Sequence, residues 1–139
     1  LEAGRFIDHA QAEAVDPEVI LAFFRSELGQ RLLGSDTVER EFKFTMLVPA
    51  AEYYPEAAGS EDRIMLQGVV DCWFGEQDGT ITVVDFKTDR VNEATVQVRA
   101  EEYREQLEVY TKALSEIMGK QVKRRYLWFF AIGEAIELS

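Results

Sequence analysis

The chain has 139 residues, a length that fits one domain able to bury a core of its own. Hydrophobic residues make up 47% and charged residues 29%, as in globular proteins, and no apolar run approaches 18 residues, which argues against a membrane span. Cys72 is the single cysteine, which excludes an internal disulfide framework and a cysteine-rich metal site and favours the reducing cytoplasm.

The net charge of −11 argues against a domain that grips DNA unaided, because such affinity comes from cations that neutralise phosphates. The charge is uneven: residues 1–98 hold 8 basic and 19 acidic side chains, whereas residues 99–125 hold 7 basic and 5 acidic ones. We interpret the basic cluster Lys123–Arg125 as a solvated face or inter-domain contact rather than a phosphate site. Carboxylates are nevertheless the ligands that hard divalent cations prefer, so the composition allows a metal site.

The first half of the chain predicts helical turns followed by a strand. Asp16 and Pro17 begin a helix, and Gly29 is expected to end it before a short second turn. The period then changes to two over residues 38–46, which predicts a strand with the even-numbered side chains on one face and the odd-numbered ones on the other. Residues 49–62 are expected to form a loop.

The second half predicts two strands joined by a hairpin, then a helix and further strands. The expected elements are strands over Arg63–Phe74 and Thr80–Lys87 around the turn Asp78-Gly79, a helix over Ala100–Met118 ended by Gly119, a strand over Arg125–Ile132 and a short strand over 135–138. This order predicts an α/β fold with a mixed central sheet flanked by helices. The later strand can lie parallel to the third through a right-handed crossover.

One pattern in these strands suggests chemistry. Asp85 and Lys87 are two residues apart on a strand and therefore share a face. Asp71 lies inside the apolar run of the preceding strand, where an ionised carboxylate is costly unless something compensates it. The hairpin makes the two strands neighbours, so a divalent cation between Asp71 and Asp85 would compensate both. Such a cation orients water and stabilises charge on phosphate, and a lysine beside it adds positive charge.

The acid-x-Lys pattern alone is a weak signal, since about one is expected by chance in a chain of this length. This chain has two, Glu41–Lys43 and Asp85–Lys87, and only the second follows a hairpin that buries another aspartate. The alternative is a surface ion pair at a strand end, with Asp71 satisfied by backbone hydrogen bonds.

Three segments in order resemble the motifs of the RecB nuclease family, within the wider PD-(D/E)xK class: Gly68–Asp71, Val84–Thr88 and Gln106–Tyr110. The resemblance extends through Val38–Phe42 and Leu127–Phe130, and covers about residues 17–138. In detail the pattern most resembles nuclease domains that follow a helicase in proteins of the AddA type. The resemblance implies a restriction-endonuclease-like core, and it implies that residues 1–139 are one nuclease domain cut from a longer helicase–nuclease chain.

The resemblance also implies roles for individual residues. Asp71 and Asp85 would bind Mg²⁺ or Mn²⁺, and Lys87 would be the catalytic lysine. Glu41 matches an upstream acid that binds metal or orients water, although Glu39 lies on the same predicted face. Further along, Gln106 and Tyr110 would position DNA, and the alternative for Tyr110 is a place in the core.

The chain departs from the family at its histidine. The family's metal-binding histidine follows a Gly-Thr pair on an upstream helix, whereas the only histidine here, His9, has no such pair ahead of it. We expect His9 to be a surface residue and the family's histidine to lie upstream of this piece, so that the piece alone cuts DNA poorly.

By resemblance, the function is that of a DNA exonuclease working on strands delivered by a helicase during double-strand break processing and recombinational repair. The implied partners are DNA, helicase domains of the same parent chain and an AddB-like protein, and no ATP-binding motif is present in this chain. One alternative is a nuclease-like module for DNA or protein interaction that is inactive as it stands. A phosphoacceptor domain built on Asp85 fits less well, because such folds alternate strand and helix throughout.

Overall fold

The computed structural model describes residues 17–138. It begins with two helices, α2 (Pro17–Arg25) and α3 (Glu27–Leu33), separated at Ser26. The Ser26 hydroxyl accepts a hydrogen bond from the backbone N–H of Gly29 at 3.0 Å, so a new helix starts where the sequence pattern predicted one continuous helix. The prediction that Gly29 ends the first helix is therefore wrong: this glycine lies buried inside α3, and Gly34 caps it.

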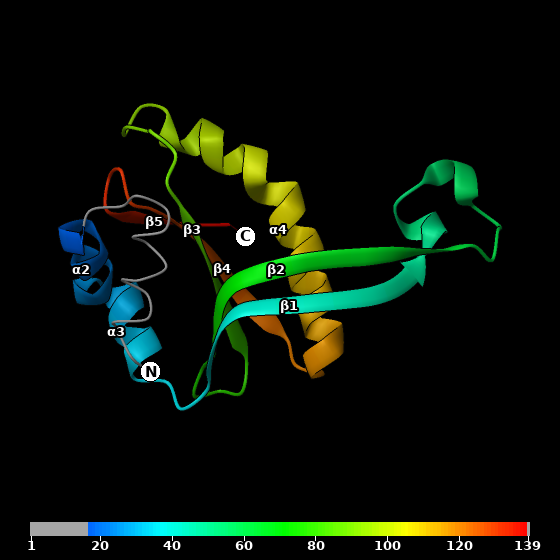
Figure 1. Cartoon of the computed structure of the whole chain (residues 1–139), viewed down its shortest axis with the longest axis horizontal. Coiled ribbons are helices and arrows are strands. Elements are labelled where there is room, and N and C mark those ends of the chain that lie inside the picture. Colours follow the sequence, from blue (N-terminus) through cyan, green and yellow to red (C-terminus); the bar gives the residue numbers. More distant parts are fainter. Residues whose placement is uncertain (1–16, 139) are drawn as a thin grey trace.

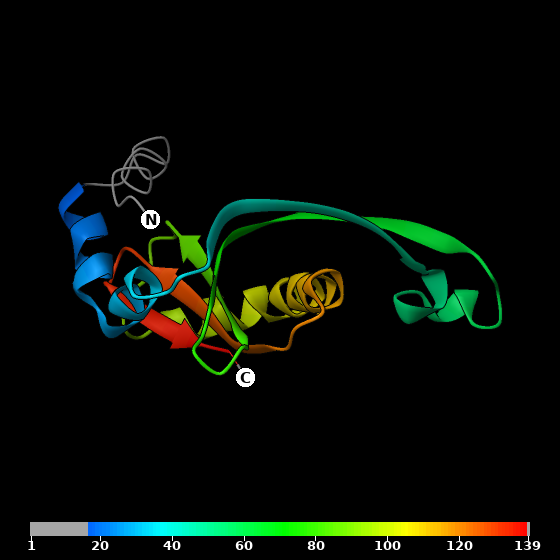
Figure 2. The ribbon, with the colours of Figure 1, turned by 90° about the horizontal axis from the view of Figure 1, so that it is seen from below.

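Two long strands follow, β1 (Val38–Pro49) and β2 (Arg63–Gly75), which pair antiparallel. Between them lie two short 3₁₀ turns, η1 (Ala50–Glu52) and η2 (Pro55–Ala57), in the segment expected to be a loop. The distal part of this ribbon, residues 42–70, is hereafter the arm. Figure 1 shows the arm reaching away from the rest of the molecule, and Figure 2 shows that it arches over the side on which α4 lies.

The remaining elements complete the predicted mixed sheet. They are β3 (Ile81–Lys87), α4 (Val96–Met118), β4 (Val122–Phe129) and β5 (Glu134–Glu137). The strand order is β1-β2-β3-β4-β5, with β3 and β4 parallel and the other neighbours antiparallel. The predicted parallel return through a helix is thus confirmed, with α4 as the crossover. No helix within residues 17–138 is long and apolar enough to cross a membrane.

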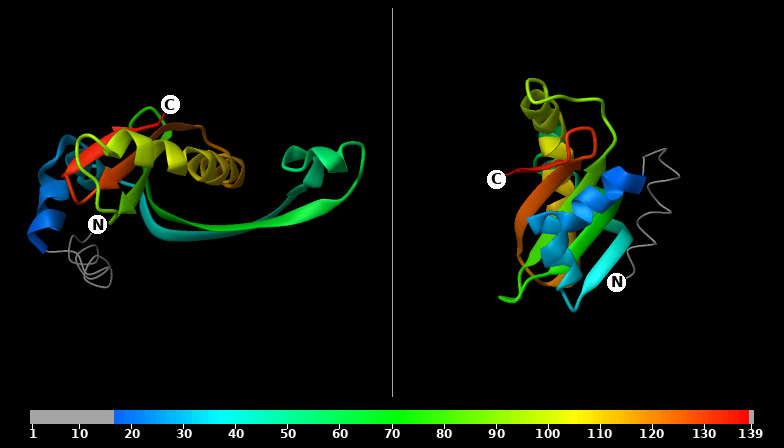
Figure 3. Two further views of the ribbon diagram at one scale, coloured as in Figure 1. Left: turned by 90° about the horizontal axis from the view of Figure 1, so that it is seen from above. Right: turned by 90° about the vertical axis from the view of Figure 1, so that its left-hand side faces the viewer.

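Helices cover both faces of the sheet (Figure 3), and an apolar cluster lies on each face. On one face α4 packs against β3 and β4, where the buried residues are Ile81, Val83, Leu127, Phe129, Leu107 and Leu114. On the other face α2 and α3 pack on the same strands, with Val84, Trp128, Phe23, Phe24 and Leu32 buried. Since odd-numbered residues of β3 face α4, Asp85 and Lys87 at its end belong to the α4 side.

The β1–β2 ribbon changes faces halfway along. Val38 packs in the cluster beneath α2 and α3, whereas Phe42 and Phe44, of the same parity, pack on the α4 side. The switch falls at Glu41, which adopts the left-handed conformation (φ 50°) that non-glycine residues seldom take. The prediction that even-numbered side chains of residues 38–46 share one face is therefore wrong, because the strand turns over at Glu41, and β2 changes faces opposite it, between Val70 and Cys72.

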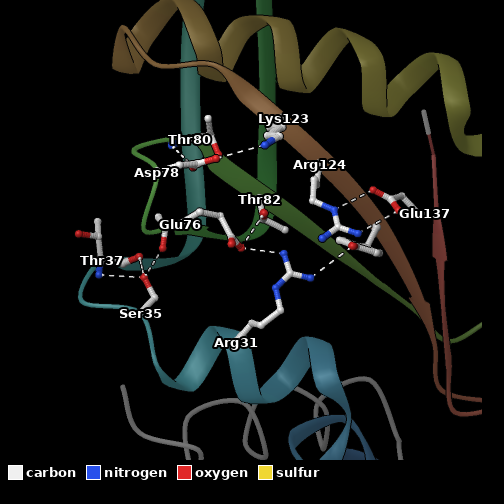
Figure 4. A network of polar contacts seen from close by, with 12 residues as sticks. Arg31, Ser35, Thr37, Glu76, Asp78, Thr80, Thr82, Lys123, Arg124 and Glu137 are labelled. Atoms are coloured by element: carbon white, nitrogen blue, oxygen red, sulfur yellow. Dashed lines mark hydrogen bonds and ion pairs between the residues drawn. The ribbon is translucent and has the colours of Figure 1, made fainter.

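The β2–β3 turn is anchored to α3 by a polar network at the far end of the sheet from Lys87 (Figure 4). The Arg31 guanidinium contacts Glu76 Oε1 at 2.8 Å, and Glu76 accepts a hydrogen bond from the Thr82 hydroxyl at 3.0 Å. Asp78 accepts hydrogen bonds from the backbone N–H and hydroxyl of Thr80, which fixes the turn. These contacts hold β2 and β3 in the register on which the site depends.

Close packing of α2 on α3 predicts that Gly29→Ala destabilises the protein. A Cβ at this position would collide with the backbone carbonyl of Phe23, so the two helices would have to separate. We expect a loss of about 3 kcal/mol or more in the free energy of unfolding, measured by urea denaturation. Gly34→Ala is the matched control, since its Cβ would meet nothing closer than 3.5 Å, and its effect should stay within about 1 kcal/mol. Equal stability of the two variants would contradict this packing.

Candidate active site

Asp71 and Asp85 meet where β2 and β3 separate. The last paired residues are Cys72 and Val84, and continuing that register by one position places Asp71 opposite Asp85. In place of a strand–strand hydrogen bond, the backbone N–H of Phe86 donates to Asp71 Oδ2 at 3.0 Å. The proximity of the two aspartates, which the sequence predicted through the hairpin, is therefore a consequence of strand register.

The Asp71 carboxyl is held in an unfavourable place for a negative charge. Burial, then the hydrogen-bonding contact with Asp85 and the charge of Asp85, together raise the pKa of Asp71 to about 8. The Phe86 N–H and the Lys87 ammonium oppose this shift without cancelling it. Burial beside Asp85 therefore disfavours the ionised form of the Asp71 carboxyl.

Lys87 lies beside this pair. Its ammonium is 2.9 Å from Asp85 Oδ2 and sits over the ring of Tyr103, 3.9 Å from the ring centre. The alternative to a metal site was an ion pair at the strand end, with backbone hydrogen bonds to Asp71. Both kinds of contact are present. They do not satisfy Asp71, whose pKa stays well above its usual range. The pair retains the capacity to take up a further positive charge.

Glu41 lies across from the site on β1. The register of β1 and β2 places it opposite Asp71, at the one position inside the ribbon where the pairing is interrupted. Its side chain is exposed, and its backbone is the left-handed point at which the ribbon changes faces. Among residues 17–138, no three histidine, cysteine, aspartate or glutamate side chains gather as a ligand group. The structure thus brings together Asp71, Asp85 and Lys87, and leaves the role of Glu41 a prediction.

Gln106 and Tyr110 lie on α4, one and two turns beyond Tyr103. The Gln106 amide donates to the Tyr110 hydroxyl at 3.2 Å, so the two side chains are oriented together. Tyr110 also packs edge-on against Phe44 at 5.5 Å, and its ring fills the space that a Cβ on Gly68 would occupy, with a separation of only 2.7 Å. Tyr110 therefore has the packing role of the alternative interpretation, at the base of the arm.

The remaining candidates add no group to the carboxylate pair in the part of the chain that the structure describes. Lys123 and Arg124 stand at the opposite end of the sheet, paired with Asp78 at 3.2 Å and with Glu137 at 3.0 Å (Figure 4), as expected of a solvated face. Cys72 is fully buried, and burial raises the pKa of its thiol to about 12, which fits the expected structural role. His9 lies outside the described residues.

Sequence reasoning missed the surroundings of Lys87 on the α4 side. The helical pattern places Tyr103 among the apolar residues of the helix and assigns no role to Asp89 or Arg99. In the structure the Tyr103 hydroxyl donates to Asp89 Oδ2 at 2.7 Å, and Arg99 Nε lies 3.6 Å from the same oxygen. Arg99 lay outside the predicted helix, which in the structure begins four residues earlier at Val96, and nothing in the sequence pattern identifies Asp89 as the partner of Tyr103.

Comparison with known proteins agrees with this geometry. The family model of the PD-(D/E)XK nuclease superfamily matches residues 4–136. Over 136 residues the chain is 41% identical to the A subunit of the ATP-dependent helicase/nuclease of Desulforudis audaxviator (strain MP104C), covering 97% of this chain and 11% of that protein. Proteins of the same name from Clostridium botulinum (strain Hall / ATCC 3502 / NCTC 13319 / Type A) and Clostridium novyi (strain NT) are each 38% identical over 137 residues.

The chain spans about a tenth of the length of these curated relatives. Among solved structures, the crystal structure of SSO0001 superposes with a TM-score of 0.51 at 16% identity, covering 97% of this chain and 57% of that one. This likeness concerns the fold, a restriction-endonuclease-like mixed sheet with helices on both faces. On the match across nearly its whole length, the chain belongs to the PD-(D/E)XK nuclease superfamily.

Proposed function

We propose that this chain is a metal-dependent DNA nuclease domain in which Asp71, Asp85 and Lys87 carry the chemistry. The observation that supports the proposal most strongly is the contact between the half-buried Asp71 carboxyl and Asp85, with the Lys87 ammonium 2.9 Å from Asp85 Oδ2. A protein rarely keeps such an arrangement for stability, because two carboxyl groups in contact repel one another once both are ionised.

The pair fits a divalent cation in its donor chemistry. Mg²⁺ and Mn²⁺ prefer carboxylate oxygens, and a cation there would replace the proton that Asp71 holds. Glu41, opposite Asp71 on β1, is the proposed third ligand or the acid that orients water. When bound, the cation would supply Lewis-acid stabilisation of phosphate charge and acidify a water molecule.

The protein's own groups would then orient the reacting phosphodiester. Asp85 holds the Lys87 ammonium at 2.9 Å, so a positive charge stands at the edge of the carboxylate pair. A positioned cation stabilises negative charge as it develops on a phosphate, and it can fix the attacking water. Gln106 and Tyr110, at the base of the arm, are proposed to position the DNA strand.

The relatives suggest the setting. Their name, which is that of the A subunit of an ATP-dependent helicase/nuclease, supports the proposal that this domain acts as an exonuclease on strands delivered by helicase domains. The wider role would be double-strand break processing and recombinational repair in the cytoplasm, with an AddB-like partner protein and with ATP used elsewhere in the parent. With a net charge of −11, the chain alone should bind and cut DNA weakly.

The Asp71 proton predicts a specific pH dependence of stability. The folded chain holds this proton up to about pH 8, whereas the unfolded chain releases it near 3.8. In EDTA this group should therefore lower the free energy of unfolding as pH rises from about 4 to 8, by at most about 1.4 kcal/mol per pH unit. Asp71→Asn should flatten that slope and raise stability at pH 8, as measured by urea denaturation.

The matched control for this prediction is Asp36→Asn, a change at an exposed aspartate in the turn before β1. It should leave the slope as in the parent chain. An unchanged slope in Asp71→Asn would mean that Asp71 is not the protonated group.

Loss of Lys87 should affect cutting alone. In the full-length helicase–nuclease, Lys87→Ala is expected to lower the rate of Mn²⁺-dependent degradation of labelled DNA by about a hundredfold or more, because a positioned charge is lost from the transition state. ATP-driven unwinding should be unchanged.

Lys123→Ala provides the control, since this exposed lysine lies at the opposite end of the sheet. Full cutting by Lys87→Ala would reject the proposed role of this residue. If Lys87→Ala and Asp85→Ala both keep full metal-dependent cutting, the cutting does not depend on this site. That result would instead favour a nuclease-like interaction module.

A further inference from the structure

We propose that Tyr103 is a positioning residue that holds the Lys87 ammonium against Asp85, and that Asp89 and Arg99 fix Tyr103 for this task. The catalytic consequence rests on the proposed nuclease function. The positioning itself concerns contacts within this chain and can be tested separately.

Lys87 is held from two sides. One is Asp85, whose Oδ2 lies 2.9 Å from the ammonium, and the other is the face of Tyr103, whose ring centre lies 3.9 Å away. The second distance is well inside the range of about 6 Å over which a cation is attracted to an aromatic face. The Lys87 side chain is only 16% exposed, so both contacts act where water screens them little.

Such restraint matters more for lysine than for most side chains. Lysine places a point charge at the end of a flexible four-carbon stem, and that charge is useful in catalysis only if the stem is held. If Asp85 also binds a cation, its negative charge is shared, and its hold on Lys87 weakens. The Tyr103 ring would then provide the main restraint on the ammonium.

Tyr103 is itself fixed by an independent contact. Its hydroxyl donates to Asp89 Oδ2 at 2.7 Å, and Arg99 Nε lies 3.6 Å from that oxygen. Asp89 comes two residues after Lys87, so this link ties the helix carrying the ring to the strand end carrying the ammonium. Burial and the Asp89 contact raise the pKa of Tyr103 to about 12, which keeps the ring neutral at working pH.

A purely structural explanation would make Tyr103 one more aromatic residue packed against the cluster beneath α4. That role would not require its hydroxyl to be bound or its ring to lie against an ammonium. The two interpretations differ in what they predict for Lys87 when the ring is replaced, and this difference can be measured.

The direct test is NMR of the whole chain, labelled with ¹³C-lysine, in metal-free buffer. The chain has five lysines, and the Lys87 signal is assigned by its loss in Lys87→Arg. Ring current from Tyr103 should shift the Lys87 ε-methylene protons upfield. The shift should persist in Tyr103→Phe and disappear in Tyr103→Leu. Tyr54→Leu, at an exposed tyrosine of the arm tip, is the control and should leave it unchanged.

The second test is kinetic and uses the full-length enzyme with labelled single-stranded DNA and Mn²⁺. Tyr103→Leu should lower kcat about tenfold while KM stays within about twofold, as expected when a cation–π contact that orients Lys87 is lost. Tyr103→Phe should lie between the parent and Tyr103→Leu, within about threefold of the parent, because the ring remains but its hydrogen bond to Asp89 is lost. Circular dichroism melting confirms that each variant is folded.

The outcomes separate this inference from the proposed function. Unmoved Lys87 protons in folded Tyr103→Leu, or equal kcat for Tyr103→Leu and the parent, would overturn the positioning role. If Lys87→Ala cuts DNA as well as the parent, the proposed function fails. The NMR comparison would then still decide whether the Tyr103 ring lies against the Lys87 side chain.

Discussion

Two carboxyl groups forced together by strand register underlie the whole arrangement. Asp71 and Asp85 face each other where β2 leaves β3, and the backbone N–H of Phe86 donates to Asp71. The network around Arg31 sets the register from the other end of the strands, so the pair cannot relax by sliding. A positive charge placed between the two carboxylates would offset their repulsion, which is the physical basis for the metal site proposed here.

The β1–β2 ribbon and α4 both contribute to the surroundings of the Asp71–Asp85 pair. The reversal of faces at Glu41 lets one ribbon contribute to the core beneath α2 and α3 near its base and to the α4 side further out. Tyr110 packs against the arm, while Tyr103, two turns earlier on the same helix, contacts Lys87. One helix thus supports both the lysine at the site and the base of the arm.

Periodicity and hairpin chemistry were enough to predict the strands, the crossover helix and the meeting of Asp71 with Asp85, because all of these depend on local spacing. The break at Ser26 was not predictable in this way, since either Ser26 or Gly29 could end a helix and tertiary packing against Phe23 decides between them. The change of faces at Glu41 was also not predictable, because the alternation of apolar and polar residues does not show that a glutamate adopts the left-handed conformation. The Asp89–Tyr103 contact joins residues 14 apart across a loop, which spacing cannot reveal.

The most direct measurement of the central claim is crystallographic. Crystals of this chain soaked with Mn²⁺ and recorded at the manganese absorption edge should show an anomalous peak within about 2.0–2.6 Å of one oxygen from Asp71 and one from Asp85. The same peak should be absent from crystals of Asp85→Ala. Manganese bound only at other carboxylates, with Asp71 and Asp85 still in contact with each other, would contradict the account.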